Sequence, residues 1–290
     1  EVVLVYCDGN PVNMCWINTY CDKKMCKICN CYRKRMFSGL KKNVQTIPFS
    51  SFFHKTLDDY KELKFEYNSN EDIKKLTYNH VGIGYAALSS YITPTRNLYP
   101  LMDQQFRTYF DAVLKTEVIL TDIVNTALDF FKPDEVGVFN TRFTVSKPIF
   151  DTCLYRKTDV VVYETTGNYL NRRQLTHFRN CASQDVPGIT RLVNIMWEES
   201  HKSEEEKINI GKQFFLNRRG AIPAGDKVYI GAQKEGLLPD NWDSSKHNIV
   251  IFNSSEDENV SLGEEFDHNL FPSQYQGIKT IFEHFKDKDD

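Results

Sequence analysis

The sequence lacks long apolar runs, glycine-rich nucleotide signatures and a large excess of either charge. No apolar stretch approaches the roughly 20 residues that a membrane-spanning helix needs. The formal net charge of −3 gives no general attraction to nucleic acid. Neither GxGxxG nor a P-loop signature occurs, so no dinucleotide fingerprint or P-loop is indicated. The start also lacks the features of a secretory signal, and we therefore expect a soluble, cytoplasmic protein.

Cysteine is scarce after residue 31, since six of the eight cysteines lie at or before that position. A chain of 290 residues buries enough apolar surface to fold without disulfides, so we expect reduced thiols. Cys26 and Cys29 have the CxxC spacing that lets two thiolates reach one tetrahedral ion, with Cys15, Cys21 or Cys31 available to complete it. A structural zinc, packed thiols without metal and disulfides are the three interpretations of this segment.

Lysine and arginine accompany these cysteines between residues 23 and 42. Such a run can contact phosphates or the anionic surface of a membrane. Peripheral association with the cytoplasmic membrane face is therefore one prediction, and a solvated face is the alternative. No nucleic-acid partner is expected, because the chain as a whole is slightly acidic.

The length favours two domains over one. We predict an N-terminal domain over 1–219 with a Cys-rich loop at 7–31, a Gly- and Pro-containing linker over 220–245, and the start of a second domain over 246–290. In the last segment, NIVIFNSSEDE predicts a strand and YQGIKTIFEHF a following helix, which together make one βα unit. A single unit leaves its strand without a partner, so we expect an N-terminal portion of a longer protein.

Several elements are predicted from apolar periodicity. Residues 2–6 indicate a strand, TIPFSSFF a short strand or connection, and GIGYAALSSYIT a helix after Gly82 that Pro94 interrupts. The longest helix is expected over 104–131, after Asp103, with its apolar positions on one buried face. GITRLVNIMWEES predicts a further helix, and the acidic HKSEEEKINIGKQFFLNRRGAIPAG a solvated segment.

The most informative stretch is 132–164, which predicts a strand, a helix and a second strand. The apolar runs 136–139 and 160–163 are too short for helices and are joined by a segment of crossover length, so we expect parallel strands. In open parallel sheets the ligand crevice lies beyond the carboxyl ends of the strands. The polar residues at these two ends are Asn140, Thr141 and Arg142, and Glu164, Thr165, Thr166 and Gly167. The sequence thus predicts an α/β, Rossmann-like sheet with a binding cleft at this edge.

Three kinds of side chain are candidates for chemistry there. At Asn140–Arg142 the backbone N–H groups, a helix dipole and a guanidinium suit a phosphate or a sugar hydroxyl, and a plain helix cap is the alternative. Glu164 is a candidate general base, or else a capping carboxylate. His80 offers an imidazole that could join the site, although a lone histidine is more often structural.

The order of these features resembles a bacterial-type family of capsular and surface polysaccharide glycosyltransferases with the two-Rossmann GT-B architecture. The similarity covers nearly the whole chain and is carried by the opening strand ending in CDG, the CKIC loop, GIGYAALSSYIT, KPDEVGVFNTRF, YETTG and NIVIFNSSEDE. It implies transfer of a sugar from a nucleotide-sugar donor to a growing glycan acceptor at the cytoplasmic face of the membrane.

The resemblance also implies roles for particular residues. Asn140 and Arg142 would line the cleft from the N-terminal domain, with Glu164 as the catalytic carboxylate. The residues that would face the cleft from the second domain are Ser254, Ser255 and Glu256. The two serines, at a helix N-terminus, would bind donor phosphate. Thr141, Thr165, Gly167 and His80 complete the predicted substrate-binding set. No cofactor is required in such enzymes, because helix dipoles and basic side chains stabilise the departing phosphate.

Two other classes of function compete with this one. A non-catalytic carbohydrate- or partner-binding module would keep the fold and use the basic cysteine loop for docking. A zinc-dependent nucleic-acid contact is the third interpretation, and the acidic balance of the chain argues against it.

Overall fold

The structure is a computed structural model, and it describes residues 1–12, 14–15, 17–18, 20–165, 175–220, 222, 236–253, 255–264 and 270–286. The chain divides into two compact units. Unit 1 consists of Glu1–Val162 and Asp257–Asp267, and unit 2 of Tyr163–Glu256 and His268–Asp290. The predicted boundaries at 219 and 245 do not coincide with this division, since the helices between residues 186 and 219 belong to unit 2.

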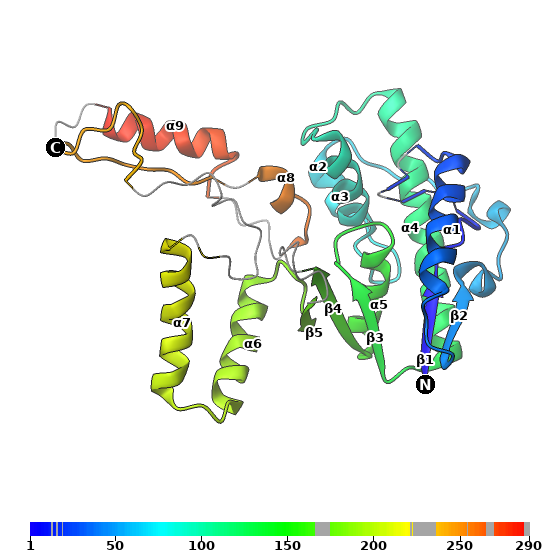
Figure 1. Cartoon of the computed structure of the whole chain (residues 1–290). Helices are drawn as coiled ribbons and strands as arrows, with labels where there is room; N and C mark the ends of the chain where they lie inside the picture. The colour runs from blue at the N-terminus through cyan, green and yellow to red at the C-terminus, as the bar shows by residue number, and fades with distance from the viewer. Residues whose placement is uncertain are drawn as a thin grey trace. The chain divides into compact units, whose positions relative to one another are not determined.

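The described helices and strands are labelled in Figure 1, and along the chain they are β1 (Val2–Tyr6), α1 (Lys23–Phe37), β2 (Val44–Pro48), the 3₁₀ helices η1 (Phe49–Phe52) and η2 (Leu57–Tyr60), α2 (Asn70–Lys74), α3 (Ile83–Thr95), α4 (Gln104–Phe131), β3 (Glu135–Phe139), α5 (Ser146–Arg156), β4 (Asp159–Thr165), β5 (Leu175–Arg179), α6 (Val186–Glu199), α7 (Glu204–Arg219), α8 (Glu256–Asn259) and α9 (Gln274–Phe285).

β1 and β2 pair in parallel, with Val2 opposite Val44 and Tyr6 opposite Pro48. α1 connects them, so the three elements form a β-α-β crossover. The Cys-rich segment was expected to be a loop through residue 31, and this is wrong from Lys23 onward. The helix begins there because the Asp22 carboxylate accepts a hydrogen bond of 2.8 Å from the N–H of Lys24, which caps the first turn.

The core of unit 1 forms around α3 and α4. The predicted bounds of α4 are confirmed, because the Asp103 carboxylate caps its start at the N–H of Phe106 and Lys132 ends it with a left-handed conformation. α3 starts after Gly82 as predicted but runs through Pro94. The helix then ends at Thr95, one residue beyond the proline that was expected to interrupt it, because proline has no N–H to continue the hydrogen-bond pattern. The side chains buried on α4 include Phe106, Phe110, Val113, Leu114, Val118 and Ile119.

α2 and α3 cross closely at Gly84. A Cβ atom built at this position would lie 1.7 Å from the carbonyl oxygen of Ile73. The Gly84 N–H also donates to the carbonyl oxygen of Leu76 at 3.1 Å. Glycine is therefore required here by contact distance between two backbones.

A second sheet has the strand order β3-β4-β5. α5 joins β3 to β4, and Figure 1 draws these two strands with their arrowheads at the same end. The predicted strands over 136–139 and 160–163 and the helix between them are thus confirmed. Val160 and Val162 are fully buried, which explains the continuous apolar run in β4.

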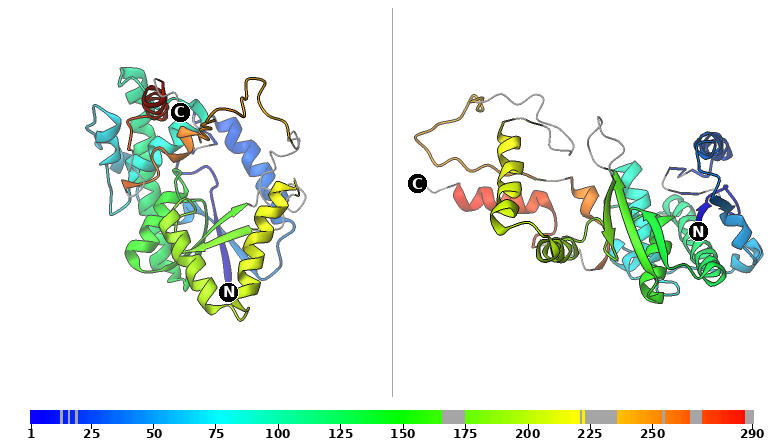
Figure 2. Two further views of the ribbon diagram at one scale, coloured as in Figure 1. Left: turned by 90° about the vertical axis from the view of Figure 1, so that its left-hand side faces the viewer. Right: turned by 60° about the horizontal axis from the view of Figure 1, so that its bottom comes forward.

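In unit 2, α6 and α7 are joined by a short connection and meet at their connected ends (Figures 1 and 2). Lys207 donates to the carbonyl oxygen of Trp197 at 2.5 Å and lies 5.3 Å from its ring. The segment that we expected to be merely solvated contains α7, because Ser203 and Glu206 form a capping box at its start. Its residues are all at least partly exposed, so the expectation of solvent contact is correct.

The strand expected in NIVIFNSSEDE does not form, since residues 247–253 carry neither helix nor strand. Ile249, Val250, Ile251 and Phe252 are all exposed there, with no neighbouring strand among the described residues to pair with them. The helix predicted after this segment is present as α9. A first βα unit is therefore not observed, although its helix is.

The described elements thus build a mixed α/β fold with two small sheets. Within the described ranges, no helix is both long enough and apolar enough to cross a membrane.

Candidate functional site

The turn after β3 is organised by Asn140. This buried residue has a left-handed backbone with φ of 55°, a conformation that asparagine tolerates better than most residues. Its side-chain oxygen accepts hydrogen bonds from the N–H groups of Thr141 at 2.7 Å and Arg142 at 3.0 Å. These two N–H groups are therefore used inside the turn, and the expectation that they face a ligand is not supported.

The start of α5 is satisfied within the protein in the same way. The Phe143 N–H donates to the Ser146 hydroxyl at 3.2 Å, and the Thr144 N–H donates to the Ser90 hydroxyl at 2.9 Å. The Thr144 hydroxyl also donates to the Ser90 hydroxyl at 2.6 Å. These backbone N–H groups at the start of α5 are thus already hydrogen-bonded within the protein. The positive charge at this end of α5 consequently comes from a side chain.

That side chain is Arg142. It is half-buried, and its guanidinium lies 3.5 Å from the Thr93 hydroxyl and 4.8 Å from the centre of the Phe143 ring. An arginine remains charged at any accessible pH and presents a planar fork of donors. The Asn140 turn and the end of α3 therefore hold a permanent cation just beyond the carboxyl end of β3.

Beneath this turn lies Glu117 of α4, which the sequence reasoning missed. Its side chain has no exposed surface, and neither carboxyl oxygen makes a hydrogen bond of ordinary geometry to a described residue. Burial raises the pKa of this carboxyl well above its usual range, against the opposing effects of the Thr144 hydroxyl and the Lys147 ammonium. The signal in the sequence was a glutamate on the apolar face of α4, between Leu114 and Leu120.

A largely buried ion pair on α5 lies near Glu117 of α4. Lys147 and Asp151 pair at 3.1 Å, and both side chains are largely buried. The second carboxylate oxygen of Asp151 accepts from the N–H of Gly82 at 3.0 Å. The pair therefore ties the residue that precedes α3 to the second turn of α5.

His80 is placed away from Arg142. Its ring stacks on Tyr155 with centroids 3.7 Å apart, in the last turn of α5, whereas Arg142 precedes the first turn. An eleven-residue helix is about 16 Å long, so the two predicted site residues stand at opposite ends of α5. The structure gives His80 a packing role.

Glu164 lies near the end of β4 and accepts a hydrogen bond of 3.0 Å from the Ser183 hydroxyl. The Ser183 hydroxyl also lies 2.8 Å from the side-chain oxygen of Gln184. Glu164 is partly exposed, so its carboxylate is accessible to a ligand. Thr165 ends β4, and its side chain and all of Gly167 lie outside the described residues.

The predicted phosphate site in 254–256 is only partly described. Ser254 lies outside the described residues, and Ser255 precedes α8, which has only four residues and so a small dipole. Glu256 accepts a hydrogen bond of 3.3 Å from the N–H of Gln274. The structure thus gives Glu256 a contact at the start of α9.

All eight cysteines are thiols. Cys26 and Cys29 are one turn apart on α1, and the Asn18 amide donates to the Cys26 sulfur at 3.3 Å. Burial raises the pKa of Cys7 to about 11 and also raises that of Cys15, which keeps both thiols protonated near neutral pH. In the described ranges no group of three or more histidine, cysteine or acidic side chains could hold a metal ion, so the zinc interpretation gains no support.

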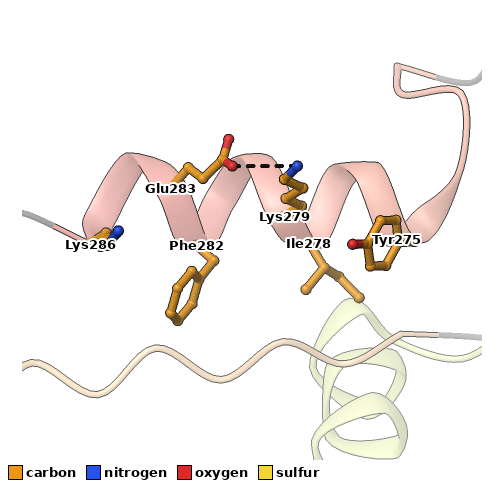
Figure 3. A pocket seen from close by; sticks show the side chains of 6 residues that line it. All are labelled: Tyr275, Ile278, Lys279, Phe282, Glu283 and Lys286. Carbon is orange, nitrogen blue, oxygen red and sulfur yellow. Dashed lines mark ion pairs between the residues drawn. The ribbon is translucent and has the colours of Figure 1, made fainter.

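A shallow hollow of about 370 Å³ runs along α9. Figure 3 shows that its lining side chains all project from this one helix, with Lys279 and Glu283 paired at 3.7 Å. A hollow formed by a single helix cannot enclose a small ligand. Its lining residues are Tyr275, Ile278, Lys279, Phe282, Glu283 and Lys286.

Comparisons with models of known families, with curated proteins and with solved structures give no match for this chain.

Proposed function

We propose that this chain belongs to a glycosyltransferase of GT-B type that moves a sugar from a nucleotide-sugar donor to a surface or capsular glycan. The sequence resemblance supplies the reaction class. The observation that carries the proposal is Arg142, a half-buried and permanent cation placed beyond the carboxyl end of a strand in a β-α-β unit. Ligands of open α/β sheets bind at such strand ends.

In the proposed reaction, Glu164 accepts the proton of an acceptor hydroxyl. The hydroxyl oxygen then bonds to the anomeric carbon of the donor sugar, while the bond from that carbon to the phosphate oxygen breaks. The nucleotide leaves with the bonding electrons, and the Arg142 guanidinium stabilises the charge on its phosphate. Asn140 supports this step by fixing the turn that carries Arg142.

A thermal-shift screen of UDP-, GDP-, CMP- and ADP-linked sugars tests the binding part of this proposal. A ligand that binds only the folded state at about 100 times its Kd adds roughly 2.7 kcal/mol of stability. We expect one nucleotide class to stabilise the wild-type chain and to stabilise Arg142→Gln much less. Arg156→Gln, at the other end of α5, is the control and should respond as the wild type does.

A second candidate is a module that binds a glycan without transferring a sugar. It is favoured by the internal use of the Thr141 and Arg142 N–H groups, which leaves fewer open donors for a phosphate. Glycan binding that is insensitive to Glu164→Gln, together with no response to any nucleotide sugar, would support this module against the transferase.

A further inference from the structure

α1 is fixed to unit 1 by one face. Along this face the Arg33 guanidinium lies 4.0 Å from the centre of the Tyr6 ring and donates to the carbonyl oxygen of Cys7 at 3.3 Å. The Asn30 amide donates to the carbonyl oxygen of Asp8 at 3.3 Å. The four less exposed residues of α1 form this face at helical spacing, and they are Cys26, Asn30, Arg33 and Phe37.

A second face of α1 is apolar and open to solvent. Met25, Ile28, Tyr32 and Met36 follow one another at three- and four-residue intervals, which places them in one stripe along the helix. The exposed fractions of these four residues are 38%, 50%, 66% and 73% in the same order. Because the inner face is formed by other residues, this stripe does not belong to the core of unit 1.

The remainder of the α1 surface is basic. Within its fifteen residues the helix carries six lysines and arginines and no acidic side chain. Five of the six lie outside the anchored face, and they are Lys23, Lys24, Lys27, Lys34 and Arg35. This concentration occurs in a chain whose net charge is −3, so it is local to one surface.

Other helices expose apolar side chains but lack this charge pattern. α7 exposes Ile210 and Phe215, yet its first turn holds three glutamates. α9 exposes Phe282, where Lys279 is paired with Glu283. Among the helices that the structure describes, an open apolar stripe beside an unopposed basic face is found on α1.

We propose that α1 docks unit 1 onto an anionic lipid bilayer. A helix of this kind lies in the plane of the interface, with its apolar side chains among the acyl chains and its lysines and arginines at the headgroups. Met25, Ile28, Tyr32 and Met36 supply the inserted stripe, and the basic side chains supply complementarity to the negative surface. The anchored face keeps the helix oriented, so the stripe is presented without any rearrangement of unit 1. This proposal does not depend on the transferase activity.

Co-sedimentation of the full chain with lipid vesicles tests the proposal. We expect binding to vesicles that contain phosphatidylglycerol and little binding to pure phosphatidylcholine, with release at high salt. Lys27→Gln with Lys34→Gln should weaken binding about fivefold for each charge removed. Tyr32→Ser with Met36→Ser should weaken it by about tenfold or more, because the inserted apolar area is lost.

Matched variants keep the test specific. Tyr32→Phe with Met36→Leu retains the apolar stripe and should bind as the wild type does. Phe215→Ser on α7 removes an equally exposed ring from another helix and should change nothing. Circular dichroism checks that each variant is folded.

Three results would overturn the proposal. One is no binding to phosphatidylglycerol vesicles at low salt, and another is an equal loss of binding for Phe215→Ser. The third is binding that needs the lysines but is unchanged by Tyr32→Ser with Met36→Ser. That last result would indicate a purely electrostatic surface for a polyanion such as RNA, which fluorescence anisotropy with a labelled single strand would detect.

Discussion

Glu117 is a carboxyl group with no contact with solvent, and it lies under the turn that carries Arg142. Because burial raises its pKa, the folded state holds this proton more tightly than the unfolded state does. Below the unfolded pKa of about 4.3 both states are protonated and the stability is fully present. As the pH rises above that value, the unfolded state is favoured progressively until the folded pKa is passed.

Glu117→Gln removes this titration while keeping the shape of the side chain. We expect urea unfolding to show similar stabilities for wild type and variant near pH 4, and a variant more stable by at least about 1.4 kcal/mol near pH 8. Glu62→Gln, at an exposed position, serves as the control. Identical pH slopes for the wild type and Glu117→Gln would mean that Glu117 is not buried as a neutral acid.

The thiols should differ widely in reactivity. Burial raises the pKa of Cys153 and Cys181 to about 11, so only about one such thiol in a thousand is ionised at pH 8. Cys29 and Cys31 are exposed on α1. Alkylation followed by mass spectrometry should label these two first. Rapid labelling of Cys153 at pH 8 would contradict the structure.

At the level of residues, the sequence located polar groups better than it predicted their partners. Asn140 and Arg142 do follow a strand, but the sequence could not show that the Asn140 side chain takes up the N–H groups of the turn. His80 was added to the site because it is an imidazole, and its stacking on Tyr155 depends on where residue 80 passes α5. The His80 outcome depends on a contact between distant parts of the chain, whereas the Asn140 contacts are local and depend on the conformation of the turn.

Asp122 connects α4 to the segment before it. Its carboxylate accepts hydrogen bonds from Lys55 at 2.7 Å, Tyr60 at 2.7 Å and Tyr78 at 3.0 Å. Hydrogen bonds to a charged group contribute more than neutral ones, and Tyr60 is buried. This one side chain therefore holds η2 and the turn at residue 78 against the helix.

Asp122→Asn should lower the free energy of unfolding by about 2 kcal/mol or more, since the amide offers one acceptor atom in place of two. Asp129→Asn on the same helix removes an exposed ion pair with Arg156 and should cost less than about 1 kcal/mol. Denaturant titration of the two variants measures the difference. Equal losses would show that the three contacts to Asp122 do not stabilise the fold.

Gly84 offers a second test of how the elements pack. Gly84→Ala should destabilise unit 1 by about 3 kcal/mol or prevent folding, because the added Cβ meets the backbone of α2. Gly137→Ala, in β3 with nothing within 4 Å, should be neutral or stabilise by about 0.5 kcal/mol. Thermal unfolding compares the two. A neutral Gly84→Ala would contradict the close crossing of α2 and α3.

The long, strongly periodic helix α4 was predicted well, whereas the caps that start α1 and α7 were not used in the prediction. Asp103 and Lys132 mark the ends of α4 in the sequence and in the structure. Elements that need a distant partner were predicted less well, as the apolar run 249–252 shows, because strand formation depends on a neighbouring strand. The pairing of β1 with β2 joins segments about 40 residues apart, and no local pattern specifies it.

For the whole molecule, the α/β class followed from the strand-helix-strand pattern, and the structure has this class. The two-Rossmann architecture remains part of the proposal, since the described sheets have two and three strands. The division into units could not be predicted, because it depends on which side chains meet and not on the composition of a linker. The proposed reaction class rests on the order of the sequence motifs, and an assay of sugar transfer tests it.

The most direct test of the proposed transferase is turnover. Purified full-length protein is incubated with each nucleotide sugar and a panel of glycan acceptors, and the nucleotide released is measured beside the product glycan. The proposal predicts acceptor-dependent release from one nucleotide class, reduced about a hundredfold or more by Glu164→Gln. Acceptor binding without any release, or release that Glu164→Gln leaves unchanged, would contradict it.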